Sequence, residues 1–224
     1  MIKFKNVWKI YKIDGEIDYQ ALKDVSLQIK EGEFVSIIGP SGSGKSTLMH
    51  LLGLLDKPTK GDIFINGKNI VDLNDDQLST LRNEFVGFVF QQFNLIPKLT
   101  VLENILLPTI YARKKLSYDP KEKALALIKK FGLAGKEFSF PNKISGGQQQ
   151  RVAILRALIM EPKLILADEP TGNLDSKTGI EIMNLLKELN EKEKITVVVV
   201  THESDIASYG KRIIKIKDGK IIKN

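Results

Sequence analysis

A glycine-rich segment between an apolar run and a helical pattern restricts the fold of this chain more than any other feature of its sequence. The run Phe34–Ile38 has the composition of a buried strand, and a helical pattern extends from Lys45 to about Leu55. The segment between them matches G-x-x-x-x-G-K-[ST] in full; its residues are Gly39, Pro40, Ser41, Gly42, Ser43, Gly44, Lys45, Ser46 and Thr47. Strand, loop and helix in this order predict a phosphate-binding loop.

The residue types in this loop suit a triphosphate, which is a dense anion. Glycines let several backbone N–H groups approach the ligand, and the N-terminus of the following helix adds partial positive charge. We expect Lys45 to meet the β- and γ-phosphates and the Ser46 hydroxyl to bind Mg²⁺. The loop alone leaves GTPases, kinases, helicases and transport ATPases open.

A second apolar strand, Leu164–Ala167, ends in two carboxylates, Asp168 and Glu169. The carboxyl ends of parallel strands line the ligand crevice of an α/β sheet, so Asp168 is placed to hold Mg²⁺. Glu169 would lie on the opposite side of the pleat if the strand continued. It is therefore the candidate general base for the attacking water.

A third motif, Ser145-Gly146-Gly147-Gln148, opens a helical pattern that runs to about Met160. Serine is a good N-cap, and the glycines leave backbone N–H groups unshielded. The segment is therefore a second potential phosphate site at a helix N-terminus. Taken by itself, it is better explained as an ordinary capped helix start.

The remaining patterns predict an α/β fold. It comprises a P-loop core with a mainly parallel sheet, an N-terminal antiparallel β subdomain and an inserted α-helical subdomain. We expect one domain over 1–224, with the core at about 1–95 and 161–224 and the helical part at about 96–160. Thr100 with Glu103 and Asp119 with Pro120 mark helix starts. Further expected elements are strands at 62–65, 68–71, 86–90, 195–201, 213–217 and 220–222 and helices at 120–130 and 177–191.

Composition limits the class of partner. The 224 residues carry a formal net charge of +7, which favours an anionic partner such as a nucleotide, a nucleic acid or a lipid head group. Cysteine is absent, so disulfides and thiolate metal sites are excluded. No apolar run reaches the roughly 18 residues of a membrane span, and no signal peptide is visible at the start.

The segment from Ile144 to Gln148 resembles the signature motif of ATP-binding-cassette (ABC) ATPases, usually Leu-Ser-Gly-Gly-Gln, with isoleucine as the apolar anchor. Other motifs follow in the order of that family. The resemblance implies roles for an adenine-stacking aromatic, a glutamine between core and helical subdomain, the acidic Walker B pair, a D-loop and a switch histidine. The corresponding residues are Tyr11, Gln91, Asp168, Glu169, Asn173-Leu174-Asp175 and His202.

The family resemblance also implies a mechanism that needs two subunits. They would face head to tail, with each ATP between one phosphate loop and the partner's signature residues Ser145, Gly146, Gly147 and Gln148. Glu169 would polarise the water, and His202 and Gln91 would sense the γ-phosphate, with Gln91 also near Mg²⁺. The transmembrane partner would be a separate permease that contacts the stretch Gln91–Pro108. The chain would then be cytoplasmic and peripheral on the inner face of the membrane.

The stretch from Phe88 to Asn104 looks like the branch with lipoprotein-releasing, macrolide-exporting and cell-division ABC ATPases. An export or lipid-extraction complex is the leading hypothesis, with no nucleic acid as partner. A nucleic-acid-associated ABC ATPase is the alternative, although neither long coiled-coil insertions nor a second cassette is present. A GTPase or kinase is a third, but no Asn-Lys-x-Asp motif occurs.

Several single residues keep two interpretations. Tyr11 would stack on adenine or pack on the sheet, and by its sequence position alone the two are about even. The basic residues from Lys211 to Lys220 would guard edge strands against pairing or bind nucleic acid, and the first is favoured. His50, on the helix after the loop, receives no role.

Overall fold

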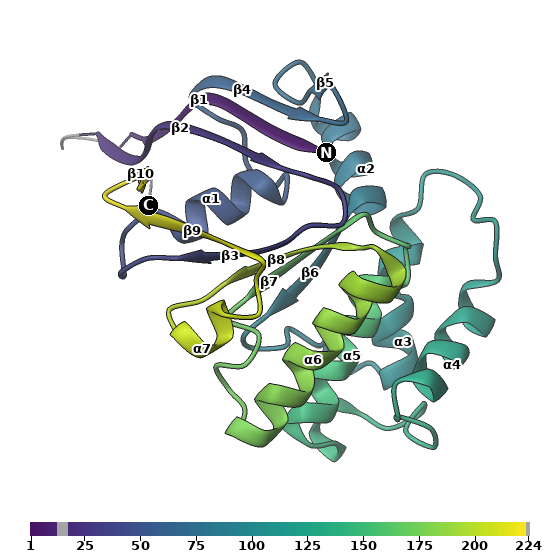
Figure 1. Cartoon of the computed structure of the whole chain (residues 1–224). Helices are drawn as coiled ribbons and strands as arrows, with labels where there is room; N and C mark the ends of the chain where they lie inside the picture. Colours follow the sequence, from purple (N-terminus) through teal and green to yellow (C-terminus); the bar gives the residue numbers. More distant parts are fainter. Residues whose placement is uncertain (13–17, 223–224) are drawn as a thin grey trace.

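The computed structural model describes residues 1–12 and 18–222 and contains two β-sheets with helices between and beside them (Figure 1). The larger sheet has the strand order β10-β9-β3-β8-β7-β6. Neighbouring strands run parallel except β9 and β10, which form the predicted closing hairpin. The mainly parallel core is therefore confirmed; its strands are β3 (Phe34–Ile38), β6 (Val86–Phe90), β7 (Leu164–Asp168), β8 (Thr196–Val200), β9 (Arg212–Lys217) and β10 (Lys220–Ile222).

The smaller sheet is antiparallel, as predicted for the N-terminal part, with the order β2-β1-β4-β5. Its hairpin at Asn66-Gly67 has positive φ at both residues (48° and 83°), the backbone that a two-residue turn requires. The second arm ends at Asn69 rather than Val71, because the Asn69 side chain accepts a hydrogen bond from the Val71 N–H. The strands are β1 (Ile2–Tyr11), β2 (Tyr19–Ile29), β4 (Lys60–Ile65) and β5 (Lys68–Asn69).

Helix α1 (Lys45–Leu52) lies between the two sheets, and its apolar side joins the core that both sheets share (Figure 1). The helix ends at Leu52 rather than at about Leu55. The chain leaves the helical conformation there because Leu54 has a φ of 57°, in the left-handed region. The phosphate loop is thereby attached at both ends to buried elements, β3 and α1.

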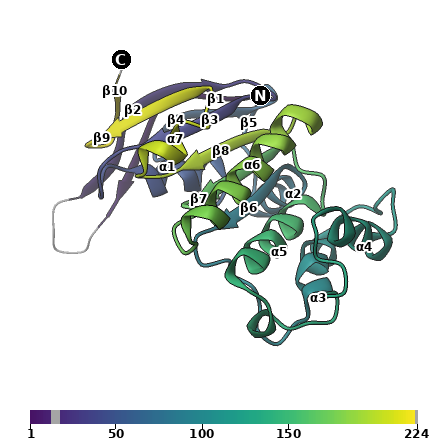
Figure 2. The ribbon, with the colours of Figure 1, turned by 60° about the horizontal axis from the view of Figure 1, so that its bottom comes forward.

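Both faces of the central sheet are covered, which explains why its strands are apolar throughout. In β7, Leu164 and Leu166 belong to the core with α1, whereas Ile165 and Ala167 belong to a second core on the other face. Helices fill that second core, on the far side of the sheet from α1 (Figure 2). They are α3 (Val101–Leu106), α4 (Pro120–Lys130), α5 (Gly146–Leu158) and α6 (Ser176–Glu193).

The predicted helix starts are confirmed by their capping hydrogen bonds. Thr100 and Glu103 form a capping box at α3, and Ser145 and Gln148 form one at α5. Asp119 accepts from the backbone N–H groups of the first turn of α4. Short helices complete the chain: η1 (Leu107–Tyr111), η2 (Pro141–Lys143) and α7 (Ser204–Ala207).

Helix α2 (Asp75–Phe85), between β5 and β6, was not predicted. Its start carries a capping box of Asn74 and Gln77, so a local signal was present in the sequence. Only Leu78 and Phe85 of this helix are buried, so its apolar pattern is sparse. None of the helices in the described part of the chain combines the length and apolar character of a membrane span.

The close approach of β6 to α5 supplies a stability prediction. A methyl group at Gly87 would lie 2.6 Å from the Ala157 carbonyl oxygen, so Gly87→Ala must push the strand and the helix apart. We expect it to lower the free energy of unfolding by about 1–3 kcal/mol in urea denaturation.

Gly179→Ala is the matched control, because its new methyl group would lie 3.4 Å from the Thr171 side chain, an ordinary contact. Alanine is also favoured over glycine inside a helix such as α6 by up to about 1 kcal/mol. Equal urea midpoints for the two variants would contradict the packing argument.

Candidate functional site

Four adjacent parallel strands end at one edge of the central sheet, and a predicted site segment follows each of them. Their last paired residues are in register: Ile37 with Val200, Val200 with Asp168, and Asp168 with Phe90. The strand order β3-β8-β7-β6 therefore brings together residues that are far apart in the sequence. The segments gathered at this edge are the loop from Gly39, His202, Glu169 and Gln91.

The loop between β3 and α1 contains two glycines that a larger residue could replace only with a steric clash or backbone strain. A methyl group at Gly39 would lie 2.2 Å from the Ile216 carbonyl oxygen, and Gly44 has a φ of 103°. The Lys45 ammonium group donates to the carbonyl oxygens of Gly39 (2.8 Å) and Pro40 (3.0 Å). The Lys45 side chain thus folds back over the loop in which it is predicted to contact the phosphates.

The residues of this loop fit a triphosphate with Mg²⁺. The buried Ser43 hydroxyl has no hydrogen-bond partner within residues 1–12 and 18–222, although such groups are normally satisfied. Ser46 is exposed at the N-terminus of α1, as are Pro40, Ser41 and Gly42 in the loop, while Thr47 is half-buried. Mg²⁺ is commonly held by one or two carboxylates together with substrate phosphates, so the single carboxylate Asp168 with hydroxyl and amide oxygens suits it.

Asp168 ends β7 and is half-buried beside this loop. Burial raises the pKa of its carboxyl, and the charge of Glu169 raises it further. Electrostatic interactions with His50 and Lys45 act in the opposite direction on the same pKa. Both therefore lie near Asp168. The proximity of His50 was missed in the sequence, where only its position on the helix after the loop gave a signal.

Glu169 does not continue the strand, so the expected place on the opposite side of the pleat, which assumed a continuing strand, does not apply. The strand ends at Asp168, and Glu169 has a φ of 44°, a left-handed backbone that is uncommon outside glycine. Its N–H donates to the Val200 carbonyl oxygen (2.9 Å). This turn directs its carboxylate toward the end of β8, where Thr201 Oγ1 donates to Oε2 (3.1 Å).

His202 is the second partner of Glu169. Its backbone N–H donates to Glu169 Oε1 (3.1 Å), and its ring Nδ1 lies 2.6 Å from the same oxygen. The hydrogen bond to Glu169 and then the charge of Glu169 raise the pKa of the exposed His202 side chain. The sequence placed His202 in the site but did not predict this contact.

Gln91 follows β6 at the same edge and is exposed. Its carbonyl oxygen accepts from Asn173 Nδ2 (2.9 Å), which ties it to the D-loop segment. A methyl group at Gly172 would lie 2.6 Å from Gln91 Nε2, so this glycine makes room for the glutamine side chain. The structure thus brings Gln91 to the segment that follows Glu169.

The aromatic at the end of β1 has a neighbour that the sequence analysis missed. Tyr11 and Tyr19 are directly paired across β1 and β2. The Tyr11 hydroxyl donates to Asp56 Oδ2 (3.4 Å), and the Lys9 ammonium group lies 5.1 Å from its ring centroid. The Tyr19 hydroxyl instead donates to the Gly42 carbonyl oxygen of the phosphate loop (3.3 Å).

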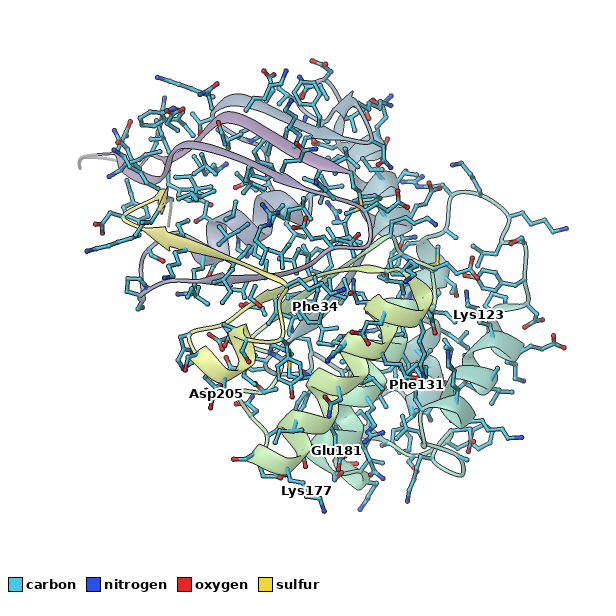
Figure 3. The ribbon with its side chains drawn as sticks, viewed as in Figure 1. Phe34, Lys123, Phe131, Lys177, Glu181 and Asp205 are labelled. Atoms are coloured by element: carbon cyan, nitrogen blue, oxygen red, sulfur yellow. The ribbon has the colours of Figure 1, made fainter. Side chains whose placement is uncertain are left out.

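The signature segment is not brought together with the phosphate loop of the same chain. Within the described ranges, no hydrogen bond or ion pair joins residues 145–148 to residues 39–47. A methyl group at Gly147 would lie 2.4 Å from Thr178 Cγ2, so α5 begins against the start of α6, beside the labelled Lys177 (Figure 3). Gly147 therefore has a packing role besides exposing N–H groups, and Ile144 is the expected buried anchor.

Comparison with known proteins identifies the family of this arrangement. A family model described as "ABC transporter" matches residues 22–172. An uncharacterized ABC transporter ATP-binding protein of Methanocaldococcus jannaschii, MJ0796, is 57% identical over 224 residues, covering 99% of this chain and 95% of that protein. A solved dimer of the cassette MJ0796 bound to ADP and Pi is 54% identical, with a TM-score of 0.89, and covers 100% of this chain and 97% of that one.

A macrolide export ATP-binding/permease protein, MacB of Bdellovibrio bacteriovorus, is 51% identical over 221 residues. The match covers 99% of this chain but 33% of MacB. The present chain therefore spans about a third of that relative.

The contact between His202 and Glu169 predicts a pH-dependent stability. Because folding raises the pKa of His202, the stabilisation is fully present below its ordinary pKa of 6.5 and is lost as the pH rises through the raised value. We expect His202→Ala to lower the free energy of unfolding by less than about 1 kcal/mol at pH 6, since the ring is exposed, and by less at pH 9.

Thr201→Val is the control, because it removes the other side-chain hydrogen bond to Glu169 without removing a titrating group. Its effect on urea unfolding is expected to stay constant between about pH 6 and 9. A His202→Ala effect that is equally flat would refute the assignment of the histidine–carboxylate contact.

Proposed function

The chain belongs to the ABC transporter family, and we propose that it is the ATP-binding subunit of a complex in which a separate membrane permease moves the cargo. It hydrolyses Mg·ATP. The observation that carries the proposal is the strand order that places the phosphate loop, Glu169, His202 and Gln91 at one sheet edge. The proposed cargo class is that of an exporter or of a lipid- or lipoprotein-extracting complex.

The site residues divide the task of holding a triphosphate. We propose that the loop from Gly39 to Thr47 binds it through backbone N–H groups, with Lys45 against the terminal phosphates and Tyr11 beside the base. Ser46, Asp168 and Gln91 would hold Mg²⁺, which offsets phosphate charge when bound. Positioning and charge stabilisation supply most of the rate in phosphoryl transfer, so these contacts are the main part of the catalysis.

Glu169 is the proposed general base. Hydrolysis needs a carboxylate within hydrogen-bond reach of the attacking water. Thr201 and the His202 backbone N–H hold this carboxylate at the sheet edge, and Oε2, which accepts only from Thr201 among the described residues, keeps a lone pair that can accept a proton. The His202 ring, 2.6 Å from Glu169 Oε1, would orient the carboxylate and the terminal phosphate together.

A second copy completes the site in this proposal. Ser145, Gly146, Gly147 and Gln148 lie apart from the phosphate loop of their own chain, on the α5 and α6 side of the molecule (Figure 1). Donors at a capped helix start suit the phosphates of a nucleotide held by another subunit. The solved relative bound to ADP and Pi is described as dimeric. By analogy, ATP joins two head-to-tail copies of this chain by supplying contacts that neither copy has alone.

The permease partner is proposed from the family and from the relative MacB, whose name joins ATP-binding and permease functions in one protein. In the present case we place the permease on another chain. The ATPase would then lie in the cytoplasm, peripheral on the inner face of the membrane. We retain the division into a core at about 1–95 and 161–224 and a helical subdomain at about 96–160.

A groove of about 660 Å³ offers the permease a contact surface. Helix α2, the stacked rings of Phe88 and Phe90, and η1 form its walls. Ile110 and Tyr111 of η1 are 74% and 67% exposed at its rim, which is unusual for large apolar side chains. The groove includes Asn94, Leu107 and Pro108 from the predicted contact stretch and adds α2 and residues 110–113 to it.

The proposed roles of Glu169 and Lys45 predict opposite defects. Glu169→Gln removes the base but keeps the phosphate contacts, so we expect ATP binding to persist while turnover falls by about 100-fold or more. The nucleotide-bound dimer then accumulates, which size-exclusion chromatography with ATP detects.

Lys45→Ala is the counterpart, because it removes a charge from the loop itself. We expect its affinity for ATP, measured by titration, to fall and the dimer to be absent. A Glu169→Gln variant that stays monomeric at full ATP occupancy counts against the two-subunit site. Unchanged affinity in Lys45→Ala counts against the phosphate loop.

The groove predicts a variant that separates docking from nucleotide binding. Ile110→Asp places a charge at its apolar rim, and we expect the chain to lose co-purification with its integral membrane partner while keeping its ATP affinity. Leu125→Asp on α4 is the control, since Leu125 is also exposed but does not line the groove. Equal recovery of the membrane partner with both variants would exclude this surface.

A further inference from the structure

The main-chain oxygens at the start of the helical insertion are held by side chains from distant segments. The Gln91 carbonyl accepts from Asn173, and the Phe93 carbonyl accepts from Arg156 Nη2 (2.8 Å). Phe93 and Asn94 have φ values of 59° and 49°, so this chain segment is neither helix nor strand. Its conformation therefore depends on donors that other elements supply.

Gln150 of α5 is a further donor of this kind, and it reaches two parts of the site. Its Nε2 donates to the Phe90 carbonyl oxygen (3.3 Å) and to the Pro170 carbonyl oxygen (2.6 Å). Phe90 immediately precedes Gln91, and Pro170 immediately follows Glu169. One amide group thus joins the residues beside the proposed γ-phosphate sensor and the proposed base to the helix that begins with the signature motif.

The chemistry of the amide fixes this arrangement. Both neighbours are carbonyl oxygens, so the NH₂ group must face them, and an amide has two hydrogens for two acceptors. Gln150 is fully buried, with 0% of its surface exposed, and its Oε1 has no partner among the described residues. Burying an unpaired oxygen is unfavourable, so packing alone gives no reason to prefer glutamine here over an apolar side chain of similar size.

We propose that Gln150 is a positioning residue that fixes Gln91 and Glu169 relative to the signature helix, so that a movement of α5 is transmitted to both. The inference rests on the proposed function. Gln150 itself faces carbonyl oxygens and not the phosphate loop, so it acts on the reaction through its neighbours. Small displacements of reacting groups lower turnover more than they lower ground-state binding.

Gln150→Met tests the proposal, since methionine has a similar volume and no donor. In steady-state ATPase assays of the full chain, normalised to bound nucleotide, we expect kcat to fall by about tenfold or more. KM for ATP is expected to stay within about twofold, because the phosphate loop is untouched.

Two controls separate positioning from stability. Gln149→Met changes the neighbouring glutamine, whose Nε2 donates to the Ile144 carbonyl oxygen and, among the described residues, to neither of the two segments, and we expect its kcat to be unchanged. Leu155→Ala removes buried apolar contact in the same helix and is expected to lower the melting temperature at least as much as Gln150→Met. Its kcat per bound nucleotide is nevertheless expected to stay near that of the unmodified chain.

The outcomes distinguish this inference from the proposed function. If the unmodified chain hydrolyses no ATP, the proposed function fails. If it does and Gln150→Met keeps its kcat, or if kcat falls equally in Leu155→Ala, the positioning role alone is overturned.

Gln150→Glu provides a second test of the proposal if the methionine variant does not fold. A buried glutamate is protonated more easily than an exposed one and can then donate one hydrogen bond. The kcat of this variant relative to the unmodified chain is expected to rise as the pH falls from about 8 to 6. A ratio independent of pH would refute the donor role.

Discussion

The alignment of four parallel strand ends is the constraint on which the site depends. The strands β3, β8, β7 and β6 are neighbours in the central sheet, although β6 and β7 are separated in the sequence by the whole helical insertion. The C-termini of the strands in such a sheet open onto one crevice, and one site segment follows each of these four strands. Residues that would otherwise be unrelated become mutual neighbours: Lys45 and Glu169 both affect the pKa of Asp168, and Glu169 affects that of His202.

The sheet edge also explains why the helical insertion matters to the chemistry. Its entry follows the end of β6 and so adjoins the site residue Gln91, whereas its exit leads to Leu164 at the start of β7. Buried contacts with the second core hold its helices against the sheet, and Arg156 and Gln150 hold the carbonyl oxygens of the entry segment. A groove bounded by α2 and η1 opens on the same segment, at Asn94. Events in the groove and at the sheet edge therefore share one stretch of backbone.

Much of the fold could be predicted because its local signals are strong. The strand Val86–Phe90, the helix Pro120–Lys130 and the closing hairpin match the structure, since apolar runs, an Asp-Pro start and an Asp-Gly turn each fix one conformation. Glu169 could not be placed, because a left-handed residue after a strand has no sequence signature outside glycine. Tyr19 and Gln150 could not be found either, because their partners are backbone oxygens on distant segments.

The lysine-bearing strand β10 has a consequence for how copies of the chain can meet. It is only three residues long, forms one margin of the six-stranded sheet and carries Lys220. A short, charged edge strand discourages hydrogen-bonded pairing with the edge strand of another copy. Association of two copies through this margin is thereby disfavoured, in keeping with the proposed two-copy site at the strand ends. If two copies join through nucleotide as proposed, this margin lowers the risk that they also join irreversibly through paired strands.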